Sequence, residues 1–381
     1  MEQPIKVSMP FGVGCFGFGI MKPPPFQLQG GEYVSQLQST LEKISTISDI
    51  NIETGRDFEA FSFEFENNIP ELDEGYGFFP PPSLDLEISF KLYIPARIQK
   101  QLYDGIELAI QPCEKFHVTI RNTYHFPVTF VELLEDTTEY DSSSGVVVVR
   151  KYLEKEFKNI DSELIRFESL GPSPFHANFM LCKDSENEHK NHLGFRCEIS
   201  QQRGYDRVIF YYKPEYFDTL SSARDILFYE LGDELGVFYK TVLSDVVRMH
   251  KWYSLNERVQ NVLSAQKQKG MFRICLNLAR NYREIHDIAI ELCQFEANEL
   301  MCLSEAEKDF KDFFTDTAIP YLEPFLKKQI ESLNRYPCRQ IRDVLGLLET
   351  RRSNLAGAII VLISAIIGGA VGSLITLLAA P

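Results

Sequence analysis

Two short motifs, each with a histidine, are the residues of this sequence whose types and spacing best suit chemistry. His117 and Thr119 are separated by one residue, and so are His176 and Asn178. Each pair lies in a run where polar and apolar residues alternate, as they do in a strand, so both members share one strand face. Two strands that present such pairs would hold a phosphate group and divide the roles of general acid and general base.

This pattern resembles the two-histidine phosphoesterases, which carry a pair of H-x-T/S motifs. The resemblance implies a phosphoesterase that uses His117 and His176. Asn178 departs from the family pattern, because Thr or Ser is expected at its position. The same residues also fit the polar faces of two half-exposed strands. Phosphoesterase activity is therefore the alternative interpretation, and we expect a protein that is not an enzyme.

Four further residues combine the ligand types that zinc prefers. Cys182 and Cys197 lie at the ends of two predicted strands, and His189 and His192 lie in the segment between them. Thiolates and imidazoles in this number would close a tetrahedral site. Their spacing matches no established zinc motif, however, and the segment also reads as a solvated hairpin loop. We therefore expect no metal and no cofactor, and the sequence has no phosphate-binding or dinucleotide-binding glycine motif.

The elements that would position these residues are mainly strands between residues 50 and 215. Residues 84–94 alternate strictly between apolar and polar side chains, which is the clearest strand signal in the chain. Shorter runs predict further strands at 61–65, 106–110, 116–121, 128–133, 164–169, 175–182, 195–200 and 207–212. Residues 146–157 favour a strand at the start and a helix at the end. Because the connections are short, we predict an antiparallel sheet in an α+β domain.

The flanking regions have different patterns. Residues 1–49 are predicted to form an N-terminal arm and a short amphipathic helix. From residue 216 the apolar spacing becomes helical and stays so to residue 353, with Leu231, Leu235 and Phe238 beginning a wide apolar stripe. This predicts an α-helical bundle after the β-rich domain.

Residues 354–381 carry no charge and are long enough for one transmembrane helix. Arginines precede this segment, so the positive-inside rule predicts a single-pass, tail-anchored membrane protein whose N-terminal domain is cytosolic. Membrane lipid is then a predicted partner. Small residues recur every four positions at Ser364, Gly368, Gly372 and Thr376, and this spacing favours close packing of two helices and a homo-oligomer. The alternative is that such residues are simply common in membrane helices.

Charge and cysteine content limit the possible partners and compartments. The net charge is −15, and residues 1–141 hold 22 acidic against 9 basic residues. This acidity argues against nucleic-acid binding, which requires clustered Lys and Arg. The eight cysteines are scattered, as suits a reducing compartment.

We therefore predict a β-rich domain that binds or senses a protein partner and a helical bundle that couples this event to an oligomerising membrane helix. One version of this hypothesis is a stress or defence effector that acts on membranes.

Overall fold

The structure is a computed structural model of the chain. It describes residues 8–20, 26–56, 58, 62–65, 86–102, 113–123, 126–135, 142–160, 162, 164–169, 177–184, 194–202, 205–266, 271–314, 322–332 and 336–379. These residues divide into two compact units. Unit 1 comprises residues 1–243 and 308–329, and unit 2 comprises residues 244–307 and 330–381.

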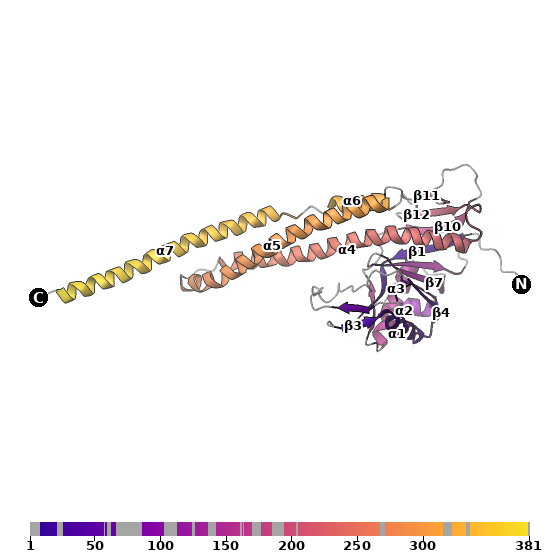
Figure 1. The fold of residues 1–381 in the computed structure, drawn as a ribbon, viewed down its shortest axis with the longest axis horizontal. Coiled ribbons are helices and arrows are strands. Elements are labelled where there is room, and N and C mark those ends of the chain that lie inside the picture. Colours follow the sequence, from indigo (N-terminus) through magenta and orange to yellow (C-terminus); the bar gives the residue numbers. More distant parts are fainter. Residues whose placement is uncertain are drawn as a thin grey trace. The chain divides into compact units, whose positions relative to one another are not determined.

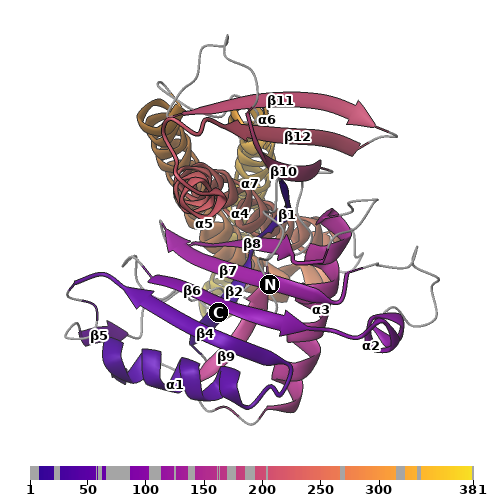
Figure 2. The ribbon, with the colours of Figure 1, turned by 90° about the vertical axis from the view of Figure 1, so that its right-hand side faces the viewer.

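A mixed eight-stranded sheet is the framework of unit 1, with the strand order β11-β12-β10-β1-β8-β7-β6-β4 (Figure 2). The strands are β1 (Ser8–Gly14), β4 (Ile47–Thr54), β6 (Leu86–Tyr93), β7 (Lys115–Thr123), β8 (Phe126–Leu133), β10 (Ala177–Lys183), β11 (Phe195–Gln202) and β12 (Tyr205–Tyr212). Two small sheets accompany it, in which β2 (Phe16–Ile20) pairs with β9 (Ile165–Ser169) and β3 (Phe26–Gln29) pairs with β5 (Ser62–Phe65).

The prediction of an antiparallel sheet was wrong for one pair of strands. β12 runs parallel to β10, with Phe179 opposite Val208, whereas every other described pair in the sheet is antiparallel. The reason lies in the position of β11 at the sheet edge. The chain leaves β10, forms β11 at the edge and returns as β12 between them. Short connections therefore do not force an antiparallel neighbour here.

One face of the sheet carries a hydrophobic core that α1 (Gly30–Glu42) and α3 (Ser142–Asn159) share. Leu86, Ile88, Phe90 and Leu92 of β6 point to this face, where the two helices cover them. A short helix, α2 (Ala96–Gln101), follows β6. Residues 146–157, which were ambiguous in sequence, belong to α3, so their valines are packed in a helix. Several side chains of α1 are fully buried in this core. Among them is Tyr33, whose hydroxyl donates a hydrogen bond to the Phe18 carbonyl oxygen at 3.0 Å.

The start of α3 is held against the sheet by two specific features. A Cβ atom on Gly12 would lie 2.4 Å from the Ser142 carbonyl oxygen, so only glycine allows the helix to approach β1 this closely. Asn178 Oδ1 accepts hydrogen bonds from the Ser143 backbone N–H at 3.1 Å and from Ser142 Oγ at 3.3 Å. These bonds satisfy donors at the beginning of the helix that would otherwise lack partners.

The other face is covered by the first half of α4 (Leu220–Gln266), a single helix of 47 residues (Figure 1). An aromatic layer joins helix and sheet. Phe228 of α4 stacks on Phe130 of β8, with ring centroids 4.1 Å apart and 8° between the planes, and also contacts Phe11 at 5.1 Å. Phe179 and Phe210 extend the layer across β10 and β12. Aromatic pairs of this kind stabilise the folded protein by more than the burial of their apolar area alone would.

The middle of α4 is buried on nearly all sides. From residue 231 to residue 239 only Asp233 is not buried. Lys240 Nζ lies 2.9 Å from Asp309 Oδ2, which belongs to the end of α5 (Met271–Phe314) in unit 1. Helix α6 (Glu323–Ser332) contributes the buried Leu326. α4 is therefore a central element of unit 1 and not a peripheral one.

Unit 2 is helical and contains the second half of α4, most of α5 and the helix α7 (Cys338–Ala379). Its core comprises Leu255, Val259, Val262, Ile285, Ile288, Leu292, Phe295, Cys338, Ile341, Leu345 and Leu348. Trp252, the single tryptophan of the chain, lies beside this core with its ring centroid 5.8 Å from Phe295 and 5.3 Å from Tyr336. Arg248, which is 4% exposed, lies 2.6 Å from Glu299 Oε1.

The predicted transmembrane helix over residues 354–381 requires correction. Within the part of the chain that the structure describes, no helix combines the length and the apolar composition needed to cross a bilayer. The apolar segment is the second half of α7, a helix whose first half carries Arg342, Asp343 and Glu349. The predictions of a single-pass, tail-anchored membrane protein and of a membrane location with a cytosolic domain are therefore wrong, whereas membrane lipid as a partner stays a prediction that nothing tests.

Candidate functional site

Polar residues gather on the α4 side of the sheet, where β4, β6, β7 and β8 lie next to one another. Alternation places every second residue of these strands on this face, and the strand register aligns them in rows. Glu53 is opposite Glu87, which is opposite Arg121, and in the next row but one Lys91 is opposite His117, which is opposite Glu132. We call this region, together with the first three turns of α4, the polar face.

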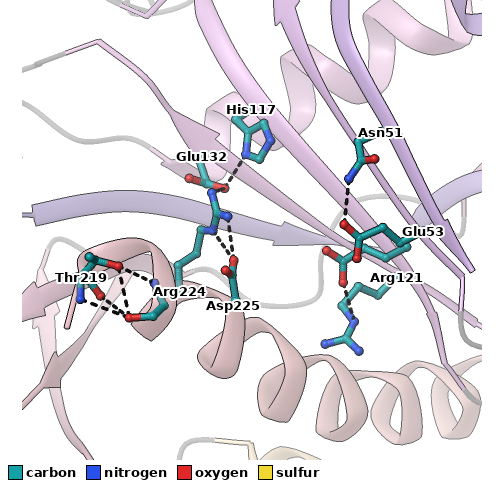
Figure 3. Close-up of polar contacts among 10 residues, drawn as sticks. Asn51, Glu53, His117, Arg121, Glu132, Thr219, Arg224 and Asp225 are labelled. Atoms are coloured by element: carbon teal, nitrogen blue, oxygen red, sulfur yellow. Dashed lines mark hydrogen bonds and ion pairs between the residues drawn. The ribbon is translucent and has the colours of Figure 1, made fainter. Parts of the chain in front are cut away.

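His117, Glu132 and Arg224 form the most buried group of the polar face (Figure 3). His117 Nδ1 lies 2.7 Å from Glu132 Oε1, and Arg224 of α4 lies 3.6 Å from the same oxygen. The side chain of Glu132 is 5% exposed, and that of Arg224 is 25% exposed. Burial would lower the pKa of Arg224, but Glu132 and Asp225 raise it above its usual value. The carboxylate thus ties the sheet to the helix.

Arg121 makes the second connection between sheet and helix. Its Nε lies 3.3 Å from Glu87 Oε2, and its guanidinium lies over the Tyr229 ring, 4.5 Å from the centroid. A Cβ atom on Gly232 would be 3.6 Å from Arg121 Cδ. The Arg121 side chain therefore lies at ordinary van der Waals distance from α4 at this position.

Acidic groups surround Glu87. Burial raises the pKa of Glu87, Arg121 and Arg224 oppose this effect, and Glu53 and Asp225 add to it. Glu53 also accepts a hydrogen bond from Asn51 Nδ2 at 2.9 Å (Figure 3). Like charges directly opposite each other on neighbouring strands destabilise a sheet. The pairing of Glu53 with Glu87 therefore destabilises an exposed part of the polar face.

The N-terminus of α4 is fixed beside this group by Thr219 and Ser222. The Ser222 backbone N–H donates to Thr219 Oγ1 at 3.1 Å, and the Thr219 backbone N–H donates to Ser222 Oγ at 3.2 Å. This reciprocal arrangement satisfies two backbone donors and sets where the helix begins. As a result Arg224 falls in the first turns, where it lies against Glu132 of β8, and the exposed Asp225 pairs with it.

A buried acid lies farther along α4. Glu234 is 5% exposed, and its Oε2 has no hydrogen-bond partner among the described residues. Burial, with a contribution from Glu230 and Asp233, raises the pKa of Glu234 to about 9. Burial and the charges of Glu198 and Glu234 raise the pKa of Cys197 to about 12. Both groups are therefore neutral near pH 7, when they sit in the folded protein.

The raised pKa of Glu234 predicts that stability falls with pH. Between pH 4.5 and pH 9 the unfolded chain releases this proton and the folded protein keeps it, so the free energy of unfolding decreases as pH rises. The contribution is at most about 1.4 kcal/mol for each pH unit. We expect Glu234→Gln to remove this slope in urea unfolding between pH 5.5 and 8.5. Glu257→Gln, at an exposed position of α4, is the control, and identical slopes in wild type and Glu234→Gln would contradict a buried neutral acid.

The structure does not bring the members of the two histidine motifs together where it describes them. His117 and the buried Thr119 face α4, whereas Asn178 faces α3 on the opposite side of the sheet and accepts the bonds at the start of that helix. His176 lies outside the described residues. The partner of His117 is instead Glu132, on the neighbouring strand.

The structure describes two of the four residues considered as zinc ligands, Cys182 and Cys197. Cys182 is opposite Tyr211 and Cys197 is opposite Phe210, so the two thiols point to opposite faces of the sheet with β12 between them. His189 and His192 lie outside the described residues. No group of three or more His, Cys, Asp or Glu suited to a metal occurs in the part that the structure describes.

The residues proposed for helix packing all belong to α7. Ser364 and Gly368 are exposed, and nothing lies within 4 Å of a Cβ atom placed on Gly368. The side chain of Thr376 and the surroundings of Gly372 lie outside what the structure describes. Self-association through this part of α7 is untested and stays a proposal.

Sequence reasoning missed the residues that join sheet and helix, which are Glu53, Glu87, Arg121, Glu132, Arg224, Asp225 and Tyr229. One signal was present in the strands, because a charged residue in an otherwise apolar alternating run is unusual at a covered position. Glu132, between Val131 and Leu133, is such a case. The pairing with α4 was not accessible, since 92 residues separate Glu132 from Arg224.

Comparison with known proteins provides no family for this chain. No protein-family model matches the sequence, and no curated protein matches it. Among solved structures, a chain of the crystal structure of the toxic C-terminal tip of CdiA from Pseudomonas aeruginosa in complex with an immune protein is similar to part of it. The match covers 44% of this chain and 91% of that chain, at 12% sequence identity and a TM-score of 0.19. A TM-score this low supports no conclusion about fold or function.

Proposed function

We propose that this protein is a non-enzymatic coupling protein, in which the sheet of unit 1 binds a protein partner and α4 relays that event to unit 2. The observation that carries the proposal is the course of α4. Residues 220–243 of this helix belong to unit 1 and residues 244–266 belong to unit 2, without interruption. A helix is stiff along its axis because every interior residue adds a backbone hydrogen bond.

Each half of α4 is held by contacts that a change in helix position would disturb. In unit 1 these are the ion pairs of Arg224 and the ring stacking of Phe228. In unit 2 they are the ion pair of Arg248 with Glu299 and the packing of Trp252. Packed interfaces and buried ion pairs favour discrete arrangements over gradual deformation, which is the property that a relay requires.

The single tryptophan supplies a test of this proposal. Trp252 lies in unit 2, 28 positions along α4 from Arg224, so its fluorescence reports on unit 2 alone. We expect Arg224→Gln to shift the Trp252 emission maximum or its quenching by iodide, because loosening the first turns alters the whole helix. Arg97→Gln, at an exposed arginine of α2, is the matched control and should leave both unchanged. Unaltered Trp252 fluorescence in a folded Arg224→Gln protein would count against the relay.

Acid–base catalysis by His117 is a second candidate function, and one contact favours it. With Nδ1 held by Glu132 at 2.7 Å, the ring is oriented and Nε2 is left for proton exchange with a substrate. The acidic surroundings formed by Glu53, Glu87 and Asp225 disfavour a phosphate ester as that substrate. Turnover lost in His117→Gln and retained in Thr119→Val would support this candidate over the coupling protein.

A further inference from the structure

The open part of the polar face has the form of a binding surface. Exposure increases across the sheet from β8 toward β4. Glu132 is buried, the Glu87 side chain is 42% exposed, and Asn51 and Glu53 are both exposed. The side of α4 next to this area presents Tyr229, 50% exposed, and Ile226, 44% exposed. Polar side chains of the strands thus lie beside exposed apolar side chains of α4.

The charge on this surface is unbalanced toward the acidic side. Burial raises the pKa of Glu87, Arg121 and Arg224 oppose this effect, and the neighbouring acids Glu53 and Asp225 add to it. The nearby cations already have partners, because Arg224 interacts with both Glu132 and Asp225, and Arg121 interacts with Glu87 and the Tyr229 ring. A positively charged occupant would relieve the repulsion between Glu53 and Glu87, and an anionic one would increase it.

We infer that this surface, defined by Asn51, Glu53, Glu87, Asp225, Ile226 and Tyr229, docks a basic segment of a partner protein that carries arginine or lysine side chains. Carboxylates accept two parallel hydrogen bonds from a guanidinium. Exposed tyrosine is also enriched where proteins meet. The inference rests on the proposed function, because it specifies the chemistry of the partner that the sheet binds.

The test uses the full chain and a fluorescein-labelled peptide of twelve residues that alternates arginine and serine. A peptide with glutamate in place of arginine is the reference. We expect the basic peptide to bind and the acidic one not to bind in fluorescence anisotropy at 150 mM salt. The double variant Glu53→Gln with Glu87→Gln should weaken binding of the basic peptide at least about tenfold, which corresponds to about 1.4 kcal/mol.

The matched control removes the same two charges elsewhere. Glu257→Gln with Glu307→Gln changes exposed positions in unit 2 and should alter the affinity less than about twofold. Equal weakening by both double variants would overturn the inference, since it would reveal attraction to the net charge alone. So would absence of binding, or unchanged binding in the Glu53 and Glu87 variant. Peptide binding without a response of Trp252 would contradict the proposed relay and leave the docking surface standing.

Discussion

Replacing Glu132 with glutamine is expected to lower the free energy of unfolding by about 2–3 kcal/mol. Glutamine has the same shape, so the substitution removes charge without opening a cavity. His117 and Arg224 would then face a neutral amide on the covered side of the sheet, where water replaces the lost interaction poorly. Arg224 keeps Asp225, which limits the loss. Urea unfolding at pH 7 measures the effect.

An exposed ion pair supplies the control for Glu132. Glu154 lies 2.9 Å from Lys158 on the surface of α3, and its side chain is 47% exposed. Glu154→Gln should cost no more than about 0.5 kcal/mol. A double-mutant cycle of Glu132→Gln and Arg224→Gln should give a coupling free energy of about 1–2 kcal/mol. If the two substitutions were additive, the carboxylate would not join sheet and helix.

Phe228→Ala should have the larger effect on stability, a loss of about 3–5 kcal/mol. The ring of Phe228 is 3% exposed and packs between helix and sheet against Phe130 and Phe11. Alanine leaves a cavity that the flat sheet face cannot readily fill. Thermal or urea unfolding followed by circular dichroism measures the change.

The control lies two residues earlier on the same helix. Ile226 is 44% exposed, so Ile226→Ala should cost less than about 1 kcal/mol. Both substitutions place alanine in α4, so a difference in helix propensity does not explain the contrast. A loss in Phe228→Ala as small as that in Ile226→Ala would show that the aromatic layer is not what holds α4 on the sheet.

Regular alternation allowed most of the sheet to be predicted from sequence. Residues 84–94 predict β6 almost to its ends, and the short runs at 195–200 and 207–212 predict β11 and β12. The parallel pairing of β10 and β12 was not predictable, because local patterns do not specify which strand enters the sheet between two others. The position of β1 was also hidden. Its glycines and aromatic residues lack polar alternation, since both of its faces are covered, as at Gly12 beneath α3.

Of the residues that form the buried group of the candidate site, only His117 was predicted from the sequence. His117 and Thr119 do share one face of β7, as strand geometry requires. The residues around His117 come from β8 and α4, and the long separation in sequence between Glu132 and Arg224 hides their contact. The apolar composition of residues 354–381 led to the transmembrane prediction, which the described part of α7 does not support. Composition states how apolar a segment is, and not what that segment contacts.

The most direct test of the coupling through α4 is amide hydrogen exchange of residues 244–266 in wild type and in Arg224→Gln. The account predicts faster exchange in these residues as well as in residues 220–243, because the second half of α4 depends on how the first half is held. Arg97→Gln should change neither segment. Faster exchange confined to residues 220–243, with residues 244–266 protected as in wild type, would contradict the coupling.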